Sequence, residues 1–555
     1  MRSSRRRNRE ITMTDGATTR MLLFVSALLL FFFLGATIRD LTFPDELRSA
    51  EVSREMLESG NWILPKLNYE IYGDKPPLYF WLLSASMAAL GKTTLAALAP
   101  SIVAGILTLL VTYRLGKTLF DPRTAWNAAW MLASFLLFLL MTQIVRMDML
   151  LTLFTTTAMT CFIHGLKYPH GGRSIILAGY VFIGAAILTK GPVGLIIPLI
   201  GLLAFYFQER ALLTRSSLYP GYGLLITVAI PLLWFLPAAL QGGGDYLYEI
   251  LVTQNAGRVV KSFDHAEPFY YYILLFPLLF APWAFYLLLY LDGGIRRDMG
   301  RDRQAIGFLT GWLLLALLFF SLVSGKNGNY LLPLTPAVAL LAARACTPLL
   351  ETPAMLERPL LFRSANLLLG TCLCLCAVFL PAVRFKTSFM NDWTNLAPTC
   401  LIFAAGGGVL VLGARHLDVR KTLYLVGATS FLLFGTVSFW LLPKINPHLS
   451  LKPMAERILM VGGPAPKVAG YQLSMRFLPY YTGAPYSNLE DPADVARFLR
   501  VPGTVAIVES QDMPAVEDGA GQPLAVMGQF QIKRKNYRLL QAIHGADNRL
   551  EARRD

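Results

Sequence analysis

Long apolar segments separated by short polar junctions make up most of this chain. A helix needs about 20 apolar residues to cross a bilayer. By that measure the pattern predicts thirteen spans, at about residues 21–38, 95–116, 124–144, 149–167, 174–190, 192–207, 221–240, 269–291, 304–323, 330–349, 360–382, 397–414 and 421–442. The predicted fold class is therefore an α-helical polytopic membrane protein.

One further apolar segment, residues 77–90, is short, begins at a double proline and carries Tyr79, Phe80 and Trp81. These features favour a helix that lies flat at the membrane interface. With this segment flat, the basic junctions between later spans fall on the side of the N-terminal arginines, as the positive-inside rule requires. If the segment spanned, those junctions would face outward. We therefore expect a cytoplasmic N-terminus and an extracytoplasmic C-terminus.

The polarity of the chain also predicts its domains. Residues 1–20 are polar and basic, residues 21–449 hold the spans with a first outer loop at 39–94, and residues 450–555 are polar. In this tail, residues 468–472 and 504–508 are predicted to be buried strands. Residues 492–499 are predicted to be an amphipathic helix capped by Asp491, and 530–540 a strand or hairpin arm. The tail is thus predicted to be a small α/β domain outside the membrane.

Composition narrows the class of protein. The chain is 55% hydrophobic and 15% charged, with a mean hydropathy of +0.49, which is too apolar for a soluble enzyme of 555 residues. Its net charge of +15 comes from short basic clusters between spans, so a nucleic-acid partner is not expected. The six cysteines have no disulfide or zinc spacing, and no glycine-rich nucleotide motif is present. Membrane lipids are the expected surroundings, without a nucleotide cofactor.

The first outer loop concentrates charge next to the membrane. Pro44, Asp45 and Glu46 are typical of a helix start, where acids face the positive end of the helix dipole. A purely structural capping role is one interpretation. Spacing adds another, because Arg48 follows Asp45 by three residues and a helix would place both on one face. Further along, Asp74 and Lys75 lie in a proline-flanked turn that could hold a phosphate or a cation.

The other outer junctions each offer one or two charged groups. Asp148 lies at the mouth of two apolar helices, where an unpaired carboxylate is costly; it either has a function or forms an ion pair with Arg146. Lys190 ends a helix and is also an ordinary C-terminal cap. The remaining outer groups are Arg258, His265 and Lys326, with His265 more simply explained as a solvated loop residue. Acids and bases at one membrane level predict a pocket for an anionic head group.

These motifs together resemble a known family. Asp45-Glu46-x-Arg48, Asp74-Lys75-Pro-Pro, Arg146-x-Asp148, Lys190-Gly-Pro and the tyrosine of Asn-Tyr330-x-x-Pro occur in this order. The chain thereby resembles the bacterial C-type (GT-C) glycosyltransferases that use polyprenyl phosphates. The resemblance is greatest to the lipid A aminoarabinose transferase family, near the protein O-mannosyltransferases, and covers the whole membrane part. It departs from the family at Asp74, where glutamate is frequent.

The resemblance implies a reaction and roles for residues. It implies an inverting transfer of a sugar, 4-amino-4-deoxy-L-arabinose first, from undecaprenyl phosphate to a lipid A phosphate on the periplasmic side of the inner membrane. The implied catalytic residues are Asp45, Asp148 and Glu46. The implied phosphate-binding residues are Arg48, Lys75, Lys190, Arg258, Tyr330 and Lys326. A divalent metal ion is a further expectation, with Asp74 and His265 as ligands. The protein is expected to act as a monomer.

Other functions fit parts of the pattern. The same lipid-linked chemistry could use another sugar, or a protein or glycan acceptor, and the sequence does not separate these. A lipid or glycan transporter is a more distant alternative, but transporters tend to have repeated halves with charges near the membrane midplane. This chain has no evident repeat, and its charged groups lie near one surface.

Overall fold

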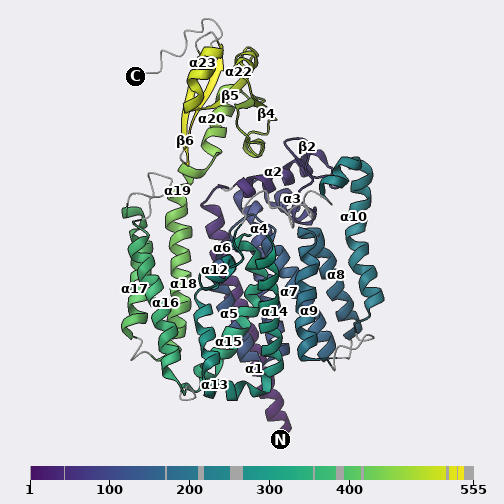
Figure 1. Cartoon of the computed structure of the whole chain (residues 1–555), viewed down its shortest axis with the longest axis vertical. Helices are drawn as coiled ribbons and strands as arrows, with labels where there is room; N and C mark the ends of the chain where they lie inside the picture. The colour runs from purple at the N-terminus through teal and green to yellow at the C-terminus, as the bar shows by residue number, and fades with distance from the viewer. Residues whose placement is uncertain are drawn as a thin grey trace.

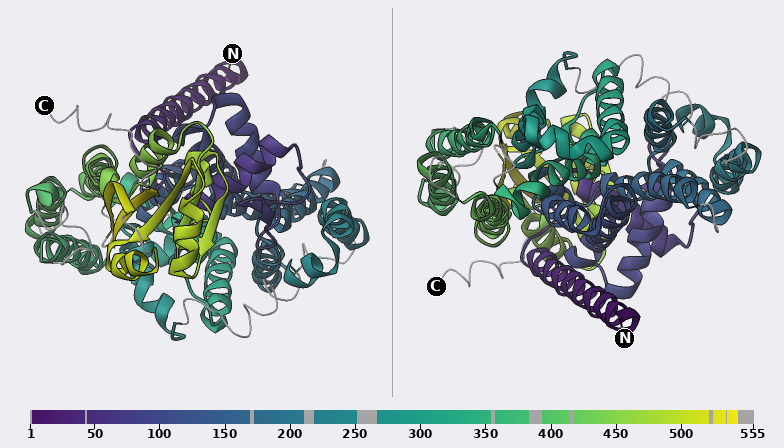
Figure 2. Two further views of the ribbon diagram at one scale, coloured as in Figure 1. Left: turned by 90° about the horizontal axis from the view of Figure 1, so that it is seen from above. Right: turned by 90° about the horizontal axis from the view of Figure 1, so that it is seen from below.

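The computed structural model describes residues 2–42, 44–168, 172–210, 218–250, 267–353, 357–382, 393–413, 418–520, 524–533 and 535–542. A tall bundle of helices carries a smaller unit that contains a β-sheet, and the N-terminus lies at the opposite end of the bundle from that unit (Figure 1). Viewed along the bundle, the sheet lies over its middle (Figure 2). Helices α16 (Pro359–Phe379), α17 (Trp393–Gly413) and α18 (Val419–Thr436) lie on one side of it, and α8 (Gly172–Lys190), α9 (Val193–Gln208) and α10 (Pro220–Tyr248) lie on the other.

Most helices of the bundle coincide with predicted apolar segments. The described helices are α1 Arg2–Thr37, α2 Pro44–Ser59, α3 Leu78–Leu90, α4 Thr94–Leu119, α5 Pro122–Ala133, α6 Leu136–Thr142, α7 Asp148–Lys167, α8 Gly172–Lys190, α9 Val193–Gln208, α10 Pro220–Tyr248, α12 Tyr271–Leu279, η2 Trp283–Leu291, α13 Gly293–Asp298, η3 Met299–Asp302, α14 Arg303–Leu322, η4 Gly328–Leu334, α15 Thr335–Glu351, α16 Pro359–Phe379, α17 Trp393–Gly413, α18 Val419–Thr436, the π-helical turn η7 Val437–Leu441 and α19 Leu442–Leu449. Within the described residues, ten single helices are long and apolar enough to cross a membrane. They confirm ten of the predicted spans and a multi-pass membrane protein.

Two predicted spans are wrong as straight helices. Residues 124–144 form α5 and α6, which are bent by 64°, and residues 269–291 form α12 and η2, which are bent by 103°. The two breaks contact each other. The backbone N–H of Leu136 donates to the carbonyl of Ala281 at 3.2 Å, and the indole of Trp283 donates to the Ser134 hydroxyl at 2.8 Å. Each break therefore supplies hydrogen-bond partners that the other lacks within its own helix.

Two short apolar helices differ in their course. α3 has 13 residues, so it is about 20 Å long and does not cover a hydrocarbon core of about 30 Å. It packs on α2 and α4, as a helix lying near the surface would. α9, also predicted to span, has only 16 residues. It nonetheless runs away from the Lys190 end, because Gln208 lies against Gly307 near the start of α14.

The C-terminal unit contains a five-stranded sheet and short helices: α20 Lys452–Gly462, β3 Lys467–Tyr471, α21 Pro479–Thr482, β4 Tyr486–Leu489, α22 Pro492–Leu499, β5 Thr504–Glu509, η8 Ser510–Asp512, α23 Met513–Ala520, β6 Leu524–Ile532 and β7 Lys535–Ala542. The strand order is β4-β3-β5-β7-β6; β4, β3 and β5 are parallel, and β7 and β6 are antiparallel to their neighbours. The predicted strands and the Asp491 cap are confirmed, since Asp491 accepts from the Ala493 N–H at 2.9 Å. The sequence pattern did not indicate β4.

The sheet unit is tied to the first outer loop. A small hairpin, β1 (Lys66–Leu67) and β2 (Glu70–Ile71), turns through Asn68 and Tyr69, which both have positive φ, as tight hairpins require. The Asn68 amide donates to the Tyr486 carbonyl and accepts from the Tyr486 N–H, both at 2.8 Å. The Tyr481 hydroxyl adds a bond to the Leu41 carbonyl at 3.2 Å. These contacts connect β4 and α21 directly to the loop that carries α2.

Candidate active site

Helix α2 lies at the end of the bundle beneath the sheet unit (Figure 1). It begins at Pro44 with Asp45 and Glu46 in its first turn, as the sequence predicts. Most of its length is buried, yet the Asp45 and Arg48 side chains are 45% and 38% exposed. They face the same side and form an ion pair of 3.4 Å, which confirms the spacing argument.

Glu46 lies on the buried side of the same turn. Its carboxylate pairs with Arg39 and accepts the backbone N–H groups of Thr42 at 3.2 Å and Val145 at 3.1 Å. These contacts fix the start of α2 against the segment that leads into α7. Glu46 is fully buried, so the structure gives it a positioning place rather than the catalytic place that the resemblance implied.

Alternating charges run inward from α2. Arg146 contacts Asp45 at 3.1 Å on one side and Asp148 at 3.3 Å on the other. Asp148 then contacts the Lys190 ammonium at 2.5 Å. The series Arg48, Asp45, Arg146, Asp148 and Lys190 therefore forms one continuous ion-pair chain from the exposed start of α2 to the end of α8.

The helix termini support the inner part of this chain. Asp148 opens α7 and Lys190 closes α8, so each charge complements the dipole of its own helix. The polypeptide backbone turns sharply after α8 at Gly191, whose φ is +74°. The Lys190 ammonium lies 4.7 Å from the centre of the Tyr330 ring on η4, a cation–π distance. Three separate elements thus hold Lys190 in place.

The ion-pair chain holds more positive than negative charge. Its three cations face two carboxylates, so one unit of positive charge is left over. Arg146 is 26% exposed and Lys190 is 15% exposed, and partial burial strengthens their attraction for an anion. Guanidinium and ammonium groups are the usual partners of phosphate oxygens. This arrangement is suited to a phosphate group.

The predicted turn at residues 72–77 lies beside this chain. The Tyr72 hydroxyl donates to Asp74 at 3.3 Å, and Tyr72 also interacts with Arg48. Burial and the neighbouring Asp74 carboxylate raise the pKa of Tyr72 above its usual range, so the hydroxyl stays protonated. A Cβ at Gly73 would come within 3.0 Å of the Glu249 carboxylate, so the turn packs closely against the end of α10.

Three predicted site residues are placed differently or lie outside the described residues. The Lys326 ammonium is buried and donates to the carbonyls of Glu267 at 2.8 Å and Val323 at 2.7 Å, which indicates a structural contact. Arg258 and His265 lie outside the described residues. Within the described part of the chain, no group of three or more His, Cys, Asp or Glu side chains could hold a metal ion. Asp74 accepts from the Tyr72 hydroxyl, and the predicted metal site, which pairs Asp74 with His265, stays a prediction.

The sequence pattern missed the central role of Arg146. The sequence predicts Arg146 only as a possible ion-pair partner of Asp148. In the structure its guanidinium also contacts Asp45, so it bridges two carboxylates from distant segments. The signal was present in the Arg-x-Asp spacing. Tyr72 belongs to the predicted turn, but the sequence alone assigns it no role in the site.

Comparisons with known proteins show what this chain is similar to. Residues 74–235 match a family model described as dolichyl-phosphate-mannose-protein mannosyltransferase. Two proteins named undecaprenyl phosphate-alpha-4-amino-4-deoxy-L-arabinose arabinosyl transferase 2 are similar in sequence. The one from Proteus mirabilis is 32% identical over 307 residues, 54% of each chain, and the one from Sodalis glossinidius is 33% identical over 326 residues, 57% of each chain. The chain thus spans a little over half the length of these curated relatives.

The fold comparison is more extensive. The crystal structure of ArnT from Cupriavidus metallidurans bound to undecaprenyl phosphate matches with a TM-score of 0.77 over 94% of this chain and 98% of that chain, at 21% identity. This chain has the GT-C fold. The predicted fold class is thereby confirmed, including the small C-terminal sheet region.

In this GT-C fold protein, α2 also carries a buried charge cluster behind the ion-pair chain. Arg54 donates to both carboxylate oxygens of Glu51 at 2.7 Å and also pairs with Glu58, which contacts Lys92. Glu55 accepts from the Tyr69 N–H at 2.9 Å. Three carboxylates therefore face two cations. Burial, helped by the neighbouring Glu55, raises the pKa of Glu51 to about 8 despite Arg54.

This raised pKa predicts a pH-dependent stability. The folded state holds a proton on Glu51 that the unfolded state, with a pKa near 4.5, releases. The stabilisation from this proton is complete below about pH 4.5 and is lost as the pH rises through about 8. We expect the melting temperature in detergent to fall between pH 5 and 9, and Glu51→Gln to flatten that fall.

Glu58→Gln is the matched control on the same helix. Lys92 and Arg54 lower the pKa of Glu58 against its partial burial, so its carboxylate is already ionised across this range. The control should therefore keep the wild-type slope between pH 5 and 9. An identical slope in the Glu51→Gln variant would show that Glu51 does not titrate there.

Proposed function

We propose that this protein is a glycosyltransferase that moves a sugar from undecaprenyl phosphate to a lipid A phosphate, with 4-amino-4-deoxy-L-arabinose as the sugar. The ion-pair chain from Arg48 to Lys190 is the observation that carries the proposal, because it ends in excess positive charge at one end of a membrane bundle. The names of the similar transferases and the shared fold support the same substrate class.

The proposed mechanism follows from the charges. Lys190, Arg48 and Lys75 bind the donor phosphate, joined by Arg146, and stabilise the negative charge that builds on this phosphate as it leaves. An oxygen of the acceptor phosphate attacks the anomeric carbon from the side opposite the donor phosphate. The bond to the donor phosphate breaks, and the configuration at that carbon is inverted. A lipid A phosphate is already an anion, so the acceptor needs orientation more than deprotonation. Asp148 holds Lys190 and Arg146 at the site.

The location of the site forms part of the proposal. The N-terminal end and the sheet unit lie at opposite ends of the bundle (Figure 1). With the N-terminal arginines on the cytoplasmic side of the inner membrane, the ion-pair chain and the sheet unit face the periplasm. Nucleotide-linked sugars are absent there, so a donor carried by a lipid suits this side. We propose that the protein acts there as a monomer.

A second candidate uses the same donor chemistry with a hydroxyl acceptor. The family model that matches residues 74–235 is described for transfer of mannose to protein. A serine or threonine hydroxyl must lose a proton during attack, and Asp45 is the natural base because its carboxylate is 45% exposed. The two candidates therefore differ in whether the Asp45 carboxylate accepts a proton.

Mass spectrometry of lipid A tests the proposal. The gene would be expressed in a bacterium that makes the aminoarabinose donor but lacks its own transferase. We expect lipid A to gain an aminopentose with the wild-type gene, and to gain none with Asp148→Asn expressed at the same level in the membrane. Unmodified lipid A together with newly glycosylated periplasmic protein would instead support the second candidate, and absence of both products would refute the transferase assignment.

A further inference from the structure

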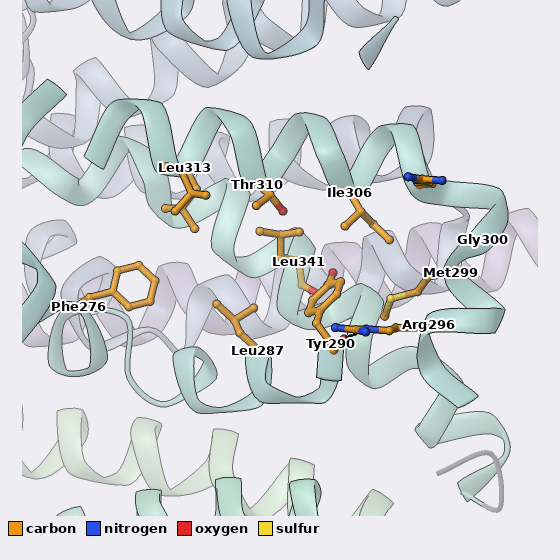
Figure 3. A pocket seen from close by; sticks show the side chains of 12 residues that line it. Phe276, Leu287, Tyr290, Arg296, Met299, Gly300, Ile306, Thr310, Leu313 and Leu341 are labelled. Carbon is orange, nitrogen blue, oxygen red and sulfur yellow. Dashed lines mark hydrogen bonds between the residues drawn. The ribbon is translucent and has the colours of Figure 1, made fainter. Parts of the chain in front are cut away.

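A cavity lies at the end of the bundle where α13 is found, opposite the ion-pair chain (Figures 1 and 3). Its volume is about 590 Å³, within the range of about 300–1,000 Å³ that is typical of small-molecule sites. Its walls are mostly apolar, with Phe276, Leu287, Ile306, Leu313 and Leu341 among the lining residues. No part of the proposed transfer reaction uses it.

The cavity lies where a predicted span is broken. α12 and η2 meet at a bend of 103°, so this chain segment does not pack along α14 as one straight helix would. The recess lies between α14 and the bent pair, with Phe276 towards one end and Arg296 towards the other (Figure 3). Leu314, a lining residue, is 56% exposed, and Leu278 nearby on α12 is 55% exposed. In a membrane, such apolar surface faces lipid chains.

Two arginines lie at one end of this apolar recess. Arg296 and Arg303 both line the cavity and are exposed. The Arg296 Nε donates to the Tyr290 carbonyl at 2.6 Å, and the Tyr290 hydroxyl donates to the Leu341 carbonyl at 3.0 Å. The bond from Nε orients the Arg296 guanidinium, whose terminal nitrogens carry further N–H donors.

The acidic residues nearby are directed elsewhere. Asp298 and Asp302 belong to the same turn, but both contact Arg344 of α15, at 3.0 Å and 2.7 Å. Among the described ion pairs, both acids are held by Arg344, and neither pairs with Arg296 or Arg303. Three arginines therefore face two carboxylates at this end of the cavity. The end of the cavity consequently keeps a positive charge, while the rest of its wall stays apolar.

We propose that this cavity binds one anionic phospholipid from the surrounding leaflet, with an acyl chain in the recess and the phosphate at Arg296 and Arg303. The apolar walls and the charged end match the two parts of such a lipid. A free phosphate would leave the walls uncovered, and a lipid without net charge would gain less from the arginines. Basic pockets between membrane helices are suited to anionic head groups.

Native mass spectrometry of the delipidated full-length protein in detergent tests this site. The probe is phosphatidylglycerol, compared with phosphatidylcholine of the same chains and with inorganic phosphate. We expect one phosphatidylglycerol to bind more tightly than the other two probes. The double variant Arg296→Gln/Arg303→Gln should lose roughly 25-fold in phosphatidylglycerol affinity, taking roughly fivefold for each arginine.

Two further variants keep the result decisive. Arg114→Gln removes an exposed arginine at the same end of the bundle, on α4, away from the cavity, and should bind phosphatidylglycerol as the wild type does. Thr310→Phe fills the recess and should weaken binding without changing the arginines. Equal affinities for the wild type and the double variant, or for the two lipids, would overturn the proposal. The readout is lipid binding alone, so it does not depend on transfer activity.

Discussion

Asp148→Asn is expected to lower the rate of sugar transfer by about 100-fold or more while the protein remains folded. The Asp148 side chain is 3% exposed and contacts both Lys190 and Arg146. A neutral amide of the same shape would leave these two cations without their shared counter-charge, so they would repel each other and leave their positions. Loss of one preorganised electrostatic group typically costs 10²–10³ in rate. The measurement is the initial rate with purified donor and lipid A.

Asp298→Asn is the matched control for this variant. Asp298 also pairs with a largely buried cation, Arg344, at 3.0 Å, but near the opposite end of the bundle. Both variants should lower the melting temperature by a few degrees, because each removes a partner of a partly buried charge. Only Asp148→Asn should stop transfer. Wild-type turnover in that variant, or equal losses in the two, would refute the placement of Asp148 in the site.

Lys190→Met is expected to lower kcat/KM for the lipid-phosphate donor by roughly 10- to 100-fold, the range expected when one hydrogen bond to a charged group is lost. Methionine keeps most of the apolar length of the side chain, but it removes the ammonium that faces Asp148 and the Tyr330 ring. We expect the KM for the acceptor to change little, since the lost charge acts on the donor phosphate. Steady-state kinetics with each substrate varied in turn separate these effects.

Lys92→Met makes the same chemical change on the same side of the bundle. Lys92 is 48% exposed and pairs with Glu58 at the surface, so its loss should leave both kinetic constants close to the wild-type values. If Lys190→Met raised the acceptor KM alone, or resembled Lys92→Met, the lysine would not bind the donor phosphate.

The ion-pair chain explains why its members come from widely separated parts of the sequence. A phosphate site in a membrane protein needs several cations, and a local cluster of cations would repel itself. Here a carboxylate separates each cation from the next, and Arg146 lies between Asp45 of α2 and Asp148 of α7. Binding of an anionic donor would complete this alternation.

Local signals in the sequence predicted a large part of this arrangement. The start of α2 at Pro44, the common face of Asp45 and Arg48, and the end of α8 at Lys190 depend on turns, caps and helical spacing, which act over a few residues. Ten spans and the Asp491 cap follow from the same short-range rules. The positive-inside pattern also placed the charged junctions at one level of the membrane.

The sequence by itself determined the membrane class, most helix bounds and the set of charged groups, because hydrophobicity and helix-end chemistry are properties of neighbouring residues. Only the tertiary structure decided which charges from distant segments meet. It buried Glu46 against Arg39 and directed Lys326 to backbone carbonyls. It also broke residues 124–144 at Ser134, where no proline or glycine marks the site, because the donors and acceptors released there are satisfied by Ala281 and Trp283, more than a hundred residues away.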